Sequence, residues 1–139
     1  MIKVIEIREI IVSSLKTVHP RIYYHLAPAK IEDPNNPGVF INTPFPYLVY
    51  DLPNSNDDGT LEQFVLDVDA WDRPSNGDTT SLETLINNAD KSLHRKTITV
   101  DDDLAVTFYR ESRLTLTDDD PNIKRRKYIY QVRTFERRI

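Results

Sequence analysis

Apolar residues recur with a helical period in two stretches of the chain. Over residues 7–18 they fall three, four and seven positions apart, which places them on one face of a helix that Pro20 must end. The same spacing returns over residues 82–93. At the start of this stretch, Thr80 and Glu83 match a capping box, in which each side chain bonds a free backbone N–H at the helix start. The sequence therefore predicts two helices.

Strict alternation of apolar and polar residues predicts strands in most of the remaining chain. The clearest are Tyr47–Leu52 and Phe64–Trp71, joined by a polar stretch that contains Asp-Gly, so we expect a hairpin with a wide tip. In the second strand an apolar face lies opposite a face that carries Asp67 and Asp69. Further strands are predicted at residues 21–26, 98–100, 104–116 and 128–132.

The segment between the first two strands contains an unusual number of helix and strand breakers. Seven prolines fall between Pro20 and Pro53, counting both, and residues 27–45 show no sustained periodicity. We expect residues 27–45 to form an exposed Pro-rich loop. The order of elements then predicts an α+β fold in a single domain over residues 1–139, with a mostly antiparallel sheet, two helices packed on one face, and long exposed loops.

Charge is divided unevenly along the chain, although the net charge is only −4. Residues 51–120 carry 17 acidic and 6 basic side chains, whereas residues 121–139 carry 1 acidic and 7 basic side chains. Such segregation is typical of a subunit that contacts copies of itself or other proteins, and equally of a basic strand neutralised within its own molecule. The candidate interface residues are Asp57, Asp58, Asp118, Asp119, Asp120, Arg125, Arg126, Arg133, Arg137 and Arg138.

Few residues are suited to chemistry. The absence of cysteine excludes disulfides and thiolate metal sites, and three isolated glycines cannot build a phosphate-binding loop. Asp67 and Asp69 on one strand face are oxygen ligands of the kind that Mg²⁺ takes, but an acidic outward face also suits a half-exposed sheet, which is the interpretation we favour. The three histidines lack metal-ligand spacing. We therefore predict no enzyme activity, no cofactor and no metal site.

The basic end of the chain, with its alternating tyrosines, raises the question of nucleic acid binding. Residues 124–127 are all basic, and Tyr128 and Tyr130 follow them. The pI of 5.3 and the inward packing expected of those tyrosines argue against it, so we expect no independent binding. No stretch reaches the roughly 18 apolar residues of a membrane span, and charged residues at the N-terminus argue against a signal peptide. The expected location is the cytoplasm.

The order of motifs resembles that of the tail-completion proteins of long-tailed bacteriophages, which include tail terminators and tail-to-head joining proteins. The resemblance rests on the N-terminal helix, residues 46–50 (PYLVY), residues 66–73 (LDVDAWDR) before the capped helix, a strand with Arg110, and a last strand with Tyr128-Ile129-Tyr130. It spans nearly the whole chain, and the loop over residues 27–45 departs from the more compact family pattern.

This resemblance implies a non-enzymatic virion protein that forms a ring, commonly a hexamer, at the head-proximal end of the tail. The implied partners are other copies of the chain, the tail tube protein and the head connector, with assembly in the host cytoplasm. Terminator and joining roles both stay open. The alternatives are a head-side connector adaptor, or a nucleic-acid-binding or nuclease accessory protein that uses the basic C-terminal strand or Asp67 and Asp69.

Overall fold

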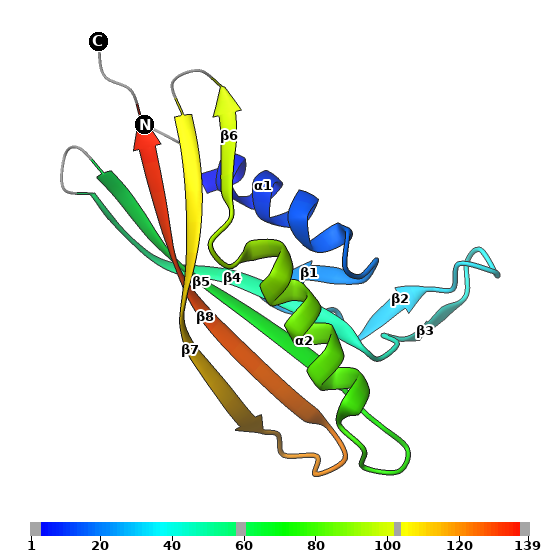
Figure 1. Cartoon of the computed structure of the whole chain (residues 1–139). Coiled ribbons are helices and arrows are strands. Elements are labelled where there is room, and N and C mark those ends of the chain that lie inside the picture. Colours follow the sequence, from blue (N-terminus) through cyan, green and yellow to red (C-terminus); the bar gives the residue numbers. More distant parts are fainter. Residues whose placement is uncertain (1–3, 58–60, 102–103, 137–139) are drawn as a thin grey trace.

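The computed structural model describes residues 4–57, 61–101 and 104–136. It contains two helices, α1 (Val4–Lys16) and α2 (Thr80–Leu93). The strands are β1 (Ile22–Tyr24), β2 (Lys30–Glu32), β3 (Phe40–Asn42), β4 (Tyr47–Asp57), β5 (Leu61–Asp72), β6 (Thr97–Asp101), β7 (Leu104–Thr117) and β8 (Lys124–Glu136). Six strands form one sheet in the order β1-β4-β5-β8-β7-β6, while β2 and β3 pair separately (Figure 1).

The predicted fold class is wrong. The strands hold more than twice as many residues as the two helices, so the chain is mainly β. The sheet is mixed, because β1 runs parallel to β4, and it curls into a half-barrel instead of offering one flat face to two helices. As Figure 1 shows, α2 lies in the hollow of this curl, whereas α1 contacts α2 and the edge strand β1.

Strand length and register explain the curl. Four strands have 11 to 14 residues, and the right-handed twist of each residue accumulates along them. The pairing also shifts register between Asp51 and Asn54 on β4, and between Arg110 and Ser112 on β7. Such irregularities bend a strand and increase its local twist. Period-two alternation is the same in a flat and in a curled sheet, so the sequence pattern gave no sign of it.

Most predicted elements are confirmed, including both helices and the antiparallel pairing of β4 with β5. The predicted capping box is wrong. Thr79 is the N-cap residue and makes no side-chain cap hydrogen bond. Instead the N–H and hydroxyl of Thr80 both donate to Asp78 Oδ1, at 2.9 and 2.6 Å, and Glu83 reaches Arg126 on β8.

The predicted loop over residues 27–45 contains the small hairpin of β2 and β3. Asp33, Asn36 and Gly38 shape its tip: the Asn35 N–H donates to Asp33 Oδ1 at 2.9 Å, and Gly38 takes a φ of +86° that favours glycine. Ten of the 13 residues from 30 to 42 are exposed, and the other three are half-buried. The hairpin projects away from the main sheet in Figure 1.

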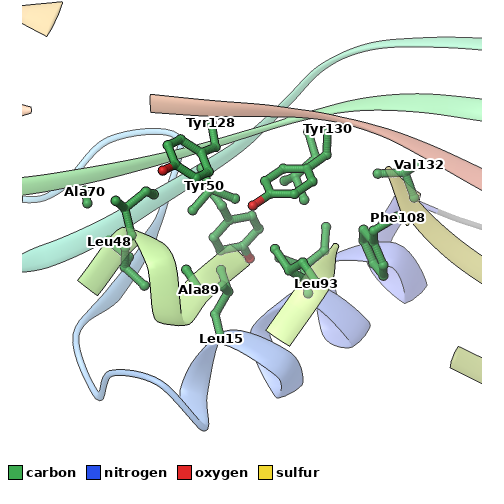
Figure 2. Packing of buried hydrophobic residues seen from close by; sticks show 14 of the residues in the cluster. Leu15, Leu48, Tyr50, Ala70, Ala89, Leu93, Phe108, Tyr128, Tyr130 and Val132 are labelled. Carbon is green, nitrogen blue, oxygen red and sulfur yellow. The ribbon is translucent and has the colours of Figure 1, made fainter. Parts of the chain in front are cut away.

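The core lies between the inner face of the sheet and the helices (Figure 2). Alternation directs every second residue of β5 and β8 into the hollow. Figure 2 shows Tyr128 and Tyr130 of β8 pointing toward Ala89 and Leu93 of α2. The fully buried side chains include Ile7, Ile11, Leu15, Leu48, Phe64, Leu66, Val68, Leu82, Ile86, Leu93, Phe108 and Tyr130.

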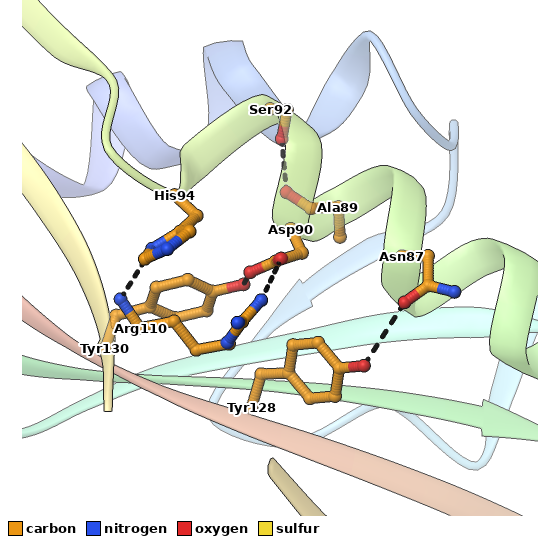
Figure 3. A network of polar contacts seen from close by, with 8 residues as sticks. All are labelled: Asn87, Ala89, Asp90, Ser92, His94, Arg110, Tyr128 and Tyr130. Atoms are coloured by element: carbon orange, nitrogen blue, oxygen red, sulfur yellow. Dashed lines mark hydrogen bonds and ion pairs between the residues drawn. The ribbon is translucent and has the colours of Figure 1, made fainter. Parts of the chain in front are cut away.

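One polar network crosses this core and ties α2 to the sheet (Figure 3). The Tyr130 hydroxyl donates to Asp90 Oδ1 at 2.6 Å, and the Arg110 guanidinium forms an ion pair with Asp90 Oδ2. The Arg110 backbone N–H also donates to His94 Nδ1 at 2.9 Å. Burial, followed by the hydrogen bond to Asp90, raises the pKa of Tyr130. The carboxylate of Asp90 therefore joins α2 to β7 and β8 at once.

We expect Tyr130→Phe to lower the free energy of unfolding by about 1.5–3 kcal/mol, because it removes a hydrogen bond to a charged, largely buried acceptor. Tyr128→Phe is the matched control. The Tyr128 hydroxyl donates to Asn87 Oδ1, an uncharged acceptor on an exposed residue, at 3.2 Å. Its loss should cost only about 0.5–1.5 kcal/mol. Urea unfolding of both variants measures the difference, and equal losses would show that Asp90 has no special role.

Candidate assembly interface

The outer face of the sheet carries the residues that point away from α2. Register brings side chains from three strands side by side: Trp71 on β5 lies between Tyr47 on β4 and Arg125 on β8. Two residues further along each strand, Asp69 lies between Val49 on β4 and Lys127 on β8. We call the group formed by Tyr47, Asp67, Asp69, Trp71, Arg125 and Lys127 the outer-face cluster.

Stacked rings form one half of the outer-face cluster. The ring centres of Tyr47 and Trp71 are 5.9 Å apart with planes 18° from parallel, and Phe45 also stacks on Tyr47, with ring centres 5.1 Å apart. The Arg125 guanidinium lies 3.9 Å above the Trp71 ring, a cation–π contact. The stack therefore joins the start of β4, with Phe45 just before it, to β5 and β8.

Paired charges form the other half. Arg125 Nη2 lies 2.5 Å from Asp69 Oδ2, and Lys127 Nζ lies 3.7 Å from Asp67 Oδ2. Beside them His25 Nδ1 lies 3.1 Å from Asp51 Oδ2. Asp51, Asp67 and Asp69 therefore each have a cation or an imidazole of the same chain beside them.

A cavity of about 240 Å³ opens over the outer-face cluster, bordered on one side by residues 25–27. Burial raises the pKa of Asp69, and the hydrogen bond and charge of Arg125 oppose it without cancelling it. Burial also raises the pKa of Asp67, against the charge of Lys127. Within the described residues, Asp69 Oδ1, Trp71 Nε1 and Arg125 Nε are buried without a hydrogen-bond partner.

The predicted basic interface residues mostly meet partners inside the chain. Arg125 pairs with Asp69 on the outer face, and Arg126 Nε lies 2.6 Å from Glu83 Oε1 of α2 on the inner face. Arg133 Nε donates to Gln131 Oε1 at 2.9 Å, and its guanidinium lies 5.1 Å from the Tyr109 ring centre. Arg137 and Arg138 lie outside the described residues. For Arg125 and Arg126 the geometry thus favours the alternative of a basic strand neutralised within its own molecule.

Of the predicted acidic interface residues, three lie in one turn and one lies at a strand end. Asp118, Asp119 and Asp120 form the turn between β7 and β8, where Asp120 Oδ2 lies 3.4 Å from Arg73 Nη2 in a half-exposed pair. Asp57 ends β4, paired in register with Glu62, and Asp58 lies outside the described residues.

The sequence alone did not identify the outer-face cluster as a unit. Alternation put Asp67, Asp69 and Trp71 on one face of their strand, but their neighbours on β4 and β8 depend on register. Arg125 is 56 residues away from Asp69 in the chain. The available signal was the alternation that places Arg125 and Lys127 on the same face of the last strand.

The arrangement offers little for catalysis. In the part of the chain that the structure describes, no three His, Asp or Glu side chains are placed to hold a metal ion. The carboxylates of Asp67 and Asp69 already face cations, which suits a structural face better than a Mg²⁺ site. Neither described helix has the length and apolar character needed to cross a bilayer.

Comparison with known proteins gives a likeness in fold alone. No family model matches the chain, and no curated protein matches it in sequence. A chain in the solved structure of the virion of a native gene transfer agent (GTA) particle is similar, with a TM-score of 0.55 and 9% sequence identity. The similarity covers 91% of this chain and 84% of that one. The two chains therefore share a fold over nearly their whole length.

Replacing Asp69 should change how stability depends on pH. The pKa of Asp69 in the folded chain is above its ordinary value of 3.8, so the folded state binds more protons than the unfolded state between the two values. The contribution of Asp69 to stability is then greatest below pH 3.8 and is lost as pH rises through the folded-state pKa. We expect the wild type minus Asp69→Asn difference in unfolding free energy to fall as pH rises through this window.

Asp78→Asn is the control, because the stability contribution of Asp78 should change with pH in the opposite direction. Hydrogen bonds from Thr80 lower the pKa of Asp78, so its contribution to stability grows with pH. Urea unfolding at a series of acidic pH values measures both differences. A difference for Asp69 that rises with pH, as for Asp78, would contradict the burial of this carboxylate.

Proposed function

We propose that the chain is a non-enzymatic structural protein of a phage-like virion, and more specifically a ring-forming tail-completion or tail-to-head joining subunit. The observation that carries this proposal is the likeness in fold to a chain of the gene transfer agent virion over 91% of the present chain. The order of motifs along the sequence supports the finer role, because it resembles that of tail-completion proteins.

The outer-face cluster supports a structural role. Its aromatic stack and ion pairs link β4, β5 and β8, and its acids face cations of the same chain instead of an open substrate site. A rigid sheet of this kind is suited to presenting surfaces and loops to neighbours. The proposed partners are further copies of the chain in a ring, the tail tube protein and the head connector, and the proposed location is the tail-to-head interface of the virion.

Electron microscopy of particles produced without this protein tests the proposal. Separate heads beside complete tails of normal length would support a joining role, and overlong tails would support termination. Supplying the wild-type chain in trans should restore intact particles in either case. Intact particles of normal length in its absence would contradict the proposed function.

The segregated charges are proposed to act between subunits through Arg137 and Arg138, the basic residues that follow β8 in the sequence. Each exposed pair contributes only about 0–1 kcal/mol, so the effect depends on repetition around a ring and weakens with salt. We expect the double variant Arg137→Glu/Arg138→Glu to lose head–tail joining in vitro while its melting temperature stays unchanged.

Arg126→Glu is the comparison for this charge reversal. It places a carboxylate beside Glu83 and should lower the melting temperature, because the pair it replaces lies within the chain. Thermal melting and the joining assay are run on both variants. Normal joining by Arg137→Glu/Arg138→Glu would refute an interface at these positions.

A further inference from the structure

The hairpin of β2 and β3, residues 30–42, exposes apolar side chains that the rest of the described chain does not cover. Phe40 is 64% exposed and Val39 is 51% exposed. An isolated two-stranded hairpin is marginal in water, and contact with a partner would cover these two adjacent apolar side chains. We call residues 30–42 the arm.

The arm is nevertheless built to hold one shape. At its tip the Asp33 N–H donates to the Val39 carbonyl at 2.7 Å, and the Gly38 N–H donates to Glu32 Oε1 at 2.8 Å. The Asn36 side-chain amide donates to Asp33 Oδ2 at 3.0 Å. These bonds fix the turn that precedes Phe40, so an arm that binds a partner loses little conformational freedom.

At its base the two ends of the arm are hydrogen-bonded to each other, and Phe45 beyond them stacks on the main sheet. The Thr43 N–H donates to the Ala29 carbonyl at 3.1 Å, and the Thr43 hydroxyl donates to the Pro28 carbonyl. Phe45 then enters the aromatic stack of the outer-face cluster. The arm therefore leaves the body at a fixed position and, in Figure 1, projects away from α1.

A groove along α1 also exposes apolar side chains. It has a volume of about 410 Å³ and is lined by Ile5, Arg8, Glu9, Val12 and Ser13 of α1 and by Tyr50 of β4. Ile5 is 58% exposed, so an apolar residue borders open solvent here as well. The Arg8 guanidinium lies 3.8 Å above the Tyr24 ring, which holds its charge at the groove.

We propose that the arm of one copy docks into the α1 groove of the next copy, with Phe40 and Val39 against Ile5 and Val12. Charge complementarity favours a second copy as the occupant: β2 presents Lys30 and Glu32 two residues apart, and the groove presents Glu9 and Arg8. The arm and the groove consist of different residues, so the contact is head-to-tail, and such a contact forms a ring where the rotation between copies closes. This inference rests on the proposed ring.

Cross-linking tests the contact directly, because the chain contains no cysteine. Phe40→Cys and Ile5→Cys are prepared as separate variants, mixed, assembled in the presence of tail tubes and oxidised. Leu114→Cys replaces Ile5→Cys in the control mixture, since Leu114 is also exposed but lies on β7. We expect at least tenfold more disulfide-linked dimer with Ile5→Cys than with Leu114→Cys, identified by mass spectrometry of the linked peptides.

Assembly itself gives a second readout. Phe40→Ser should reduce ring formation, followed by native mass spectrometry, at least tenfold, whereas Leu114→Ser should leave it unchanged. Rings that form with no link between Phe40→Cys and Ile5→Cys, or that tolerate Phe40→Ser, would overturn the arm contact and leave the proposed function standing. If wild-type protein forms no ring on tail tubes, both the proposed function and this contact are wrong.

Discussion

The structure depends on how the inner face of the curled sheet is closed. Long strands direct Phe64, Leu66 and Val68 of β5 into the hollow, together with the tyrosines of β8, and α2 is the helix that lies across it. Burial alone would let a helix slide along such a surface, since apolar contact is not directional. Asp90 fixes its position, because one carboxylate accepts from Tyr130 and pairs with Arg110 on the adjacent strand.

Closing the inner face in this way leaves the other surfaces for contacts with neighbours. The outer-face cluster locks β4, β5 and β8 together by stacking and ion pairs, and it anchors the base of the arm through Phe45. The arm and the α1 groove lie beyond this framework, where exposed Phe40 and Ile5 have no cover within the described chain. A rigid body with two complementary surfaces is what a ring subunit requires.

Local pattern predicted the elements well and their assembly poorly. Helical spacing over residues 82–93 located α2, and alternation located β5 and β7. The curl and the parallel β1–β4 pair depend on twist and on contacts distant in sequence, which alternation does not encode. For the same reason the sequence showed Asp90, Arg110 and Tyr130 as separate residues, 20 and 40 positions apart, and Arg125 as an interface candidate instead of the partner of Asp69.

The central claim is that this fold serves as a repeated structural subunit of a virion. A cryo-electron microscopy reconstruction of purified particles tests it most directly, by fitting the curled sheet with α2 in its hollow into the density where the tail meets the head. The account predicts a closed ring of copies at that position, with each β2–β3 hairpin reaching its neighbour. Particles that lack the chain, or that carry it as single scattered copies, would contradict the account.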